Sequence, residues 1–185
     1  MAVTLSVHVE DKPGSLDRVA SLIRRRAFNI ISLAVGRSEQ PDVSRMTIVV
    51  DTDADGARRI EANLYKLLNV LQVQNITTSP SIVRDMALVK VAATEQTRSS
   101  VVQLAEVFRA RIVDVAPDSL VIEITGTEDK VDGLVEVLRP YGVLELVRTG
   151  RIAIARGARP AARAEGPRQL PGQAPVETPG ISCSV

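Results

Sequence analysis

An order of elements that occurs twice along the chain constrains its fold more than any other feature of the sequence. The letters run in parallel: "LSVHVE" at residues 5–10 resembles "LVKVAA" at 88–93, and "NVLQVQNI" at 69–76 resembles "GVLELVRT" at 142–149. A repeat of about 80 residues indicates a duplicated domain, because the units of a solenoid are shorter. We therefore expect two small domains of one architecture.

The apolar spacing predicts strand, helix, strand, strand, helix, strand in each half. In the first half the predicted strands are 4–10, 30–35, 45–51 and 70–76, and the helices are 15–25 and 53–69. In the second half the strands are 86–93, 111–117, 120–126 and 143–154, and the helices are 99–110 and 128–142. This order is typical of a ferredoxin-like βαββαβ domain, in which two helices cover one face of a four-stranded antiparallel sheet. The predicted fold class is α+β, with two such domains in tandem.

The helices of the first half have apolar stripes at helical spacing. The stripe of the first helix is Leu16, Val19, Ala20 and Ile23, and the stripe of the second is Ile60, Leu64, Leu67 and Leu68. Asp53 or Asp55 is expected to cap the second helix.

We place the first domain at residues 1–78, the second at 79–157 and a disordered tail at 158–185. The tail holds five of the ten prolines and almost no apolar periodicity, so it cannot bury enough surface to offset its ordering entropy. The second face of each sheet is expected to lack a cover. We therefore predict at least a dimer.

Charge and composition exclude several kinds of partner. Lys and Arg total 23 and Asp and Glu total 22, which argues against a large nucleic-acid footprint and against an electrostatic membrane anchor. The sequence has no run of about 18 apolar residues that would span a bilayer, and its start does not resemble a secretion signal. Cys183 is the one cysteine, so no internal disulfide forms. We expect a cytoplasmic protein that binds neither nucleic acid nor membrane.

The residues needed for catalysis or for metal binding are missing. His8 is the one histidine, so neither a zinc site nor a Ser-His or Cys-His pair is available, and we predict no catalytic residues and no metal ligands. We interpret His8 as a surface or interface residue. An RNA-binding module of this fold would need aromatic side chains on its open face. The positions expected there are Thr4, Ser6, His8, Thr47 and Val49. None of them is aromatic, which argues against an RNA-binding module.

The loop in "VHVEDKPGSLDRV", residues 7–19, is the best candidate for a site. Pro13 fixes φ in the first helical turn, and Gly14 has no side chain to block a ligand. The amides of residues 14–16 are then free donors at a positive helix end, which suits a carboxylate, and Asp11 suits an ammonium group. A free amino acid carries both charges. The alternative is a plain turn with a capping Asp.

The second half offers a comparison for this loop. Its corresponding junction, "AATEQTRSS" at residues 92–100, has neither Gly nor Pro. If the loop were only a turn, both copies would be free to keep similar chemistry. The difference favours separate roles, with a small ligand bound by the first domain.

Residues 4–157 resemble the acetolactate synthase (acetohydroxyacid synthase) small subunit, whose N-terminal part is an ACT domain. The resemblance lies in the first 50 residues, where "FNI" and "SRMTIVV" are the most specific letters, and in "ALVKVAA", "IVDVAPDSLVIEITG" and "VRTGRIAIARG". It implies a non-catalytic regulatory subunit of branched-chain amino acid biosynthesis. Such a subunit activates a catalytic large subunit that carries thiamine diphosphate, magnesium and FAD, while this chain itself has no cofactor.

The resemblance also implies an effector site between the ACT domains of a homodimer, with feedback inhibition by valine, leucine or isoleucine. Amides near Gly14 hold the effector carboxylate, with Pro13 and Ser15 in the same loop. Asp11 and Asn29 orient the polar end, and Leu16 and Ile30 line the aliphatic pocket. The C-terminal domain is implied in contact with the large subunit.

Two residues depart from the family pattern. Ala27 stands where the family usually has Gly, at a backbone position that we expect to need positive φ. Ile31 stands where the family usually has an acidic residue. We expect an altered effector affinity. The alternatives are a feedback-insensitive activating paralogue and a stand-alone amino-acid-sensing ACT protein.

Overall fold

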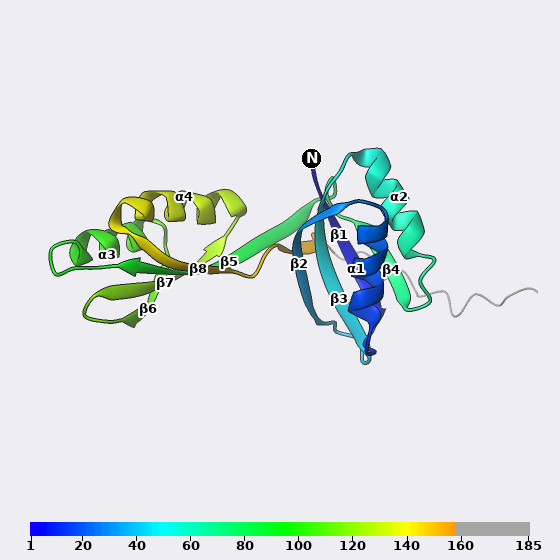
Figure 1. The fold of residues 1–185 in the computed structure, drawn as a ribbon, viewed down its shortest axis with the longest axis horizontal. Coiled ribbons are helices and arrows are strands. Elements are labelled where there is room, and N and C mark those ends of the chain that lie inside the picture. Colours follow the sequence, from blue (N-terminus) through cyan, green and yellow to red (C-terminus); the bar gives the residue numbers. More distant parts are fainter. Residues whose placement is uncertain (158–185) are drawn as a thin grey trace, which may run out of the picture.

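A computed structural model describes residues 1–157, so the predicted tail at 158–185 lies outside the described residues. The chain forms two units that lie side by side and are joined by one long strand (Figure 1). Within residues 1–157, no helix is long and apolar enough to cross a membrane.

The first unit is an antiparallel sheet with two helices on one face (Figure 1). Its elements are β1 (Ala2–Glu10), α1 (Ser15–Arg25), β2 (Asn29–Arg37), β3 (Val43–Asp51), α2 (Ala54–Leu64) and β4 (Val70–Asn75). The strand order is β2-β3-β1-β4. Alternate residues of β1 (Leu5, Val7 and Val9) are buried in one core with Val19 and Ile23 of α1, because a strand presents every second side chain to the same face.

The second unit repeats this architecture. Its elements are β5 (Ser81–Ala92), α3 (Arg98–Val107), β6 (Arg111–Val115), β7 (Ser119–Gly126), α4 (Glu128–Leu138), a short 3-10 helix η1 (Arg139–Tyr141), β8 (Val143–Arg148) and β9 (Ile152–Ala155). The main strand order is β6-β7-β5-β8. Ala87, Val89 and Val91 of β5 share a core with residues of both helices. The predicted α+β fold of two tandem ferredoxin-like units is confirmed.

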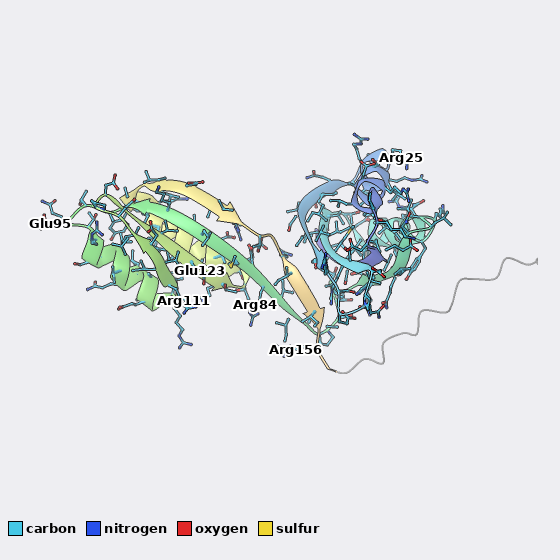
Figure 2. All side chains as sticks on the ribbon, turned by 90° about the horizontal axis from the view of Figure 1, so that it is seen from below. Arg25, Arg84, Glu95, Arg111, Glu123 and Arg156 are labelled. Carbon is cyan, nitrogen blue, oxygen red and sulfur yellow. The ribbon has the colours of Figure 1, made fainter. Side chains whose placement is uncertain are left out.

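The strand β5 is longer than predicted and belongs to two layers. Its residues 85–92 pair with β7, whereas residues 81–84 pair with β9. The predicted strand at 143–154 is in fact two strands, because Gly150 adopts a φ of 78° between them and ends the pairing with the body of the second sheet. The paired segments 81–84 and 152–155 form an arm that reaches toward the first unit, with Arg84 and Arg156 marking it in Figure 2.

This arm corrects the expectation that the second face of the first sheet lacks a cover. Thr4, Ser6, Thr47 and Val49 all lie on that face and are buried. From β3, the Arg45 Nη2 donates a hydrogen bond of 2.8 Å to the carbonyl of Ala153. A groove of about 350 Å³ separates the rest of the arm from β2 and β3. The long-range pairing of the arm, which local spacing does not reveal, supplies the contact.

The helix α2 is shorter than predicted. Asp53 caps it, since its Oδ1 accepts a hydrogen bond of 2.7 Å from the Gly56 amide. The helix ends at Leu64, after which the Leu67 amide donates to the Leu64 carbonyl and the chain turns. Leu68 is 97% exposed, so its predicted place on the apolar stripe is wrong. The stripe pattern continued by chance through a turn.

His8 of β1 is half-buried beside Arg45, its neighbour on β3. Burial lowers the pKa of His8 below its ordinary value of 6.5, the positive charge of Arg45 lowers it further, and Glu39 acts in the opposite direction. The unfolded chain therefore takes up this proton first as the pH falls.

We predict that His8 makes the protein less stable in mild acid. Its contribution is fully present above pH 6.5 and is lost as the pH falls through the folded-state pKa. Denaturant unfolding of the wild type and of His8→Gln at about pH 7.5 and about pH 5 tests this, and the wild type should lose more free energy of unfolding. Equal losses in the two proteins would show that His8 is not responsible.

Candidate functional site

The loop after β1 is a tight turn whose geometry requires Gly14. Lys12, Pro13, Gly14 and Ser15 form the turn, and the Ser15 amide donates a 3.1 Å hydrogen bond to the Lys12 carbonyl. Gly14 has φ 83° and ψ −4°, which are the values of the third residue of a type II turn, and proline suits the second. The helix α1 begins at Ser15. The sequence predicted Pro13 in the first helical turn. In the structure Pro13 instead precedes the helix.

The start of α1 offers free backbone donors. Among the described residues, no acceptor is found for the amides of Gly14, Leu16 and Asp17. The Ser15 amide is occupied by Lys12, so the prediction of free amides at 14–16 holds for two of the three. Such amides lie at the positive end of the helix dipole, where an anion is stabilised.

Ser15 adds an unusual feature to the same position. The residue is 5% exposed, and its buried Oγ has no hydrogen-bond partner among the residues described. A buried polar atom left without a partner costs about 1–3 kcal/mol. Leu16, the next residue, is exposed. The loop therefore combines an unsatisfied hydroxyl, two free amides and an exposed aliphatic side chain.

Asp11 supplies a negative group in the same loop, three residues before Gly14. The Ser44 Oγ donates a 3.0 Å hydrogen bond to Asp11 Oδ1, and the Asp11 amide donates to the carbonyl of Asp42. Lys12 pairs with Glu10 at 3.1 Å rather than with Asp11. The hydrogen bond that Lys12 donates to Glu10, and next in size the one from Asn69, lower the pKa of Glu10 below its ordinary value. Among the described residues, no lysine or arginine forms an ion pair with the Asp11 carboxylate.

Ser44 is a site residue that the sequence analysis missed. It is buried at the start of β3, and the pairing of Glu10 with Val43 brings it next to Asp11. The signal that would have found it is the register of β1 against β3: Ser44 pairs with Val9, two residues before Asp11, so Ser44 and Asp11 are diagonal neighbours on one face.

Asn29 and Ile30 lie at the other end of the same sheet. Asn29 pairs with Asp51, which also pairs with Ala2 at the start of β1, whereas Glu10 at the end of β1 pairs with Val43. Nine residues of extended strand separate these ends by roughly 25 Å. Asn29 is exposed, and Ile30 packs against the core. One copy of the chain therefore does not bring these two residues to Asp11 and Gly14.

The two residues that depart from the family pattern lie close to Asn29. Ala27 has φ 58° in the turn before β2, so this position does require positive φ, as predicted. Ile31 is the extra residue of a β-bulge, because the pairing of β2 with β3 shifts between Ile30 and Ser32. The residue is 53% exposed, and the bulge bends the strand directly after Asn29 and Ile30.

Metal-binding groups do not gather in this region. Across residues 1–157, no three His, Cys, Asp or Glu side chains lie close enough together to hold a metal ion.

Comparisons with known proteins match both units to one type of subunit. Residues 5–72 match a family model described as an AHAS small subunit-like ACT domain, and residues 84–157 match the small subunit of acetolactate synthase.

Whole proteins give the same result. A probable acetolactate synthase small subunit from Archaeoglobus fulgidus is 49% identical over 85% of this chain and 98% of its own length. The acetolactate synthase small subunit of Mycolicibacterium smegmatis is 48% identical over 84% of this chain and 92% of its own. The crystal structure of the small subunit from Thermotoga maritima has a TM-score of 0.80 at 37% identity, covering 86% of this chain and 99% of that one.

The positive φ of Ala27 gives a prediction about stability. Left-handed backbone costs a residue with a Cβ about 1–2 kcal/mol, and glycine loses part of that gain through its greater freedom when unfolded. We expect Ala27→Gly to raise the free energy of unfolding by about 0.5 kcal/mol, measured by denaturant titration.

The control makes the same change where the backbone is ordinary. Ala62 is exposed within α2, and Ala62→Gly should lower the free energy of unfolding by about 1 kcal/mol. If both variants are destabilised equally, the strain at Ala27 is absent.

Proposed function

The chain belongs to the acetolactate synthase small-subunit family, and we propose that it stimulates a catalytic large subunit and makes it sensitive to a branched-chain amino acid. One observation carries the choice of ligand: the loop that holds the carboxylate of Asp11 leads, three residues later, into free amides at the start of α1. An α-amino acid presents a carboxylate and an ammonium group a few ångströms apart. The loop offers a complementary group to each.

The proposed contacts follow from the chemistry of the loop. The amides of Gly14 and Leu16 donate hydrogen bonds to the effector carboxylate at the positive helix end, and the Ser15 hydroxyl is a further donor within the same turn. The Asp11 carboxylate accepts hydrogen bonds from the ammonium group. Leu16 is exposed next to these groups, so its side chain is free to cover an aliphatic one. This combination favours valine, leucine or isoleucine over a polar amino acid.

We propose that the site is completed by a second copy of the chain. The strand β2 is an edge of its sheet, and among the described residues no strand pairs with its outer side. Antiparallel pairing with β2 of a second copy, centred near Leu33, would set the start of one β2 beside the end of the other. Asn29 and Ile30 of the second copy would then approach Asp11 and Gly14 of the first. A two-fold dimer forms two such sites.

The catalytic chemistry is assigned to the partner. We propose that this subunit is itself non-catalytic and cytoplasmic, and that the large subunit carries thiamine diphosphate, magnesium and FAD. The second unit is proposed to contact the large subunit. Because Ala27 and Ile31 lie next to Asn29, an activating subunit with weak feedback is the second candidate.

A reconstituted holoenzyme tests the proposed function. Acetolactate formation by a catalytic large subunit is measured alone, with this chain, and with this chain plus valine, leucine or isoleucine. Stimulation by the chain and inhibition by at least one amino acid are expected. Stimulation without inhibition would leave the second candidate, and no stimulation would overturn the assignment.

We predict that Asp11→Ala weakens valine binding about tenfold or more, because a hydrogen bond to a charged group contributes about 1.5–3 kcal/mol. Isothermal titration calorimetry measures this directly. Stimulation of the large subunit should remain, since Asp11 lies in the first unit. The matched control is Asp114→Ala, which removes an exposed carboxylate from β6 of the second unit. Unchanged valine affinity in Asp11→Ala would refute the assigned role.

A further inference from the structure

A close contact joins β2 of the first unit to the turn between β8 and β9. The Arg151 amide donates a 3.1 Å hydrogen bond to Ser32 Oγ. A Cβ added to Gly150 would lie 2.2 Å from the same oxygen and 3.3 Å from the Ser32 Cβ, so even a methyl group does not fit between them. Gly150 also has a φ of 78°. We call this contact between Ser32 and residues 150–151 the clasp.

On its second-unit side, the clasp is tied to the first turns of α4. Arg151 forms an ion pair with Glu128, the first residue of α4. Arg148 pairs with Asp132 on the same helix at 2.6 Å and with Asp85, which is 3% exposed, at 2.5 Å. Burial lowers the pKa of Arg148, but the hydrogen bonds and charges of Asp85 and Asp132 outweigh this and raise it. A displacement of residues 148–151 therefore acts directly on α4.

On its first-unit side, the clasp is close to the proposed effector contacts. Ser32 follows Asn29 and Ile30 after the bulged Ile31. A bulge interrupts the ladder and sets the local bend of a strand, so a shift of Asn29 or Ile30 changes the direction in which Ser32 points. A pocket of about 380 Å³ borders the clasp, and its lining includes Ile31 of the first unit and Arg151 of the second. The clasp is therefore a close local contact with open space beside it.

We propose that Ser32 is a positioning residue that transmits occupancy of the effector site to the second unit through the clasp. The proposal rests on the proposed function. Effector contact at Asn29 and Ile30 changes the geometry of the bulge. Ser32 then moves against residues 150–151. The ion pairs of Arg148 with Asp132 and of Arg151 with Glu128 pass this displacement to α4. Tight contacts suit such a relay because packed groups change between discrete arrangements rather than deforming gradually.

The test separates effector binding from its consequence. Ser32→Ala removes the acceptor of the Arg151 amide and changes neither Asp11 nor Gly14. For Ser32→Ala in the reconstituted holoenzyme, we expect stimulation of the large subunit and the calorimetric Kd for valine to stay within about twofold of wild type. Inhibition by valine should be weakened about fivefold or more, which is the lower end of measured couplings between sites. Glu128→Gln, at the far end of the relay, should act alike. Ser99→Ala on an exposed position of α3 is the matched control.

The outcomes distinguish the two proposals. Joint loss of valine affinity, stimulation and thermal stability in both Ser32→Ala and Glu128→Gln would indicate a structural role and overturn the relay. Inhibition of both variants as strong as in wild type would overturn the relay and leave the proposed function intact. Absence of inhibition in the wild type would overturn the feedback proposal and the relay with it.

Discussion

Antiparallel pairing on both sides of β3 is the constraint on which the proposed site depends. Because β3 runs antiparallel to β1 and to β2, these two strands run in the same direction. The loop after β1 and the start of β2 therefore lie at opposite ends of the sheet. A pocket that uses Asp11 and Gly14 together with Asn29 and Ile30 needs two chains, and the free edge of β2 offers the pairing that supplies the second.

The strand β5 connects the two units and holds them in one arrangement. It pairs with β7 and β8 in the body of the second unit and with β9 in the arm. The arm meets the first sheet through Arg45, and the turn before β9 meets it through Ser32. The first unit thus contacts its neighbour through the two strands, β2 and β3, that also define the position of the effector contacts.

The sequence predicted those features that depend on local spacing and missed those that depend on distant pairing. Alternating apolar residues and helical stripes were sufficient to predict the elements of both βαββαβ units. The Pro-Gly pair was sufficient to predict the turn at Gly14. Residues 152–154 were predicted to be extended, as the end of the strand 143–154, but residues 81–84 and the pairing between the two segments that forms the arm were missed. The bond from Ser44 to Asp11 and the separation of Asn29 from Gly14 both follow from strand register, which spacing along the chain does not fix.

Mixed copies test most directly the central claim that each effector site is shared by two chains. One copy carries Gly14→Asp and the other Asn29→Ala, so that neither forms a complete site with its own kind. After the two are unfolded and refolded together, half of the dimers are mixed and each has one site built from unchanged residues. Our account predicts that valine binding by calorimetry returns at about one site per four chains. Binding no better than that of either variant alone would contradict it.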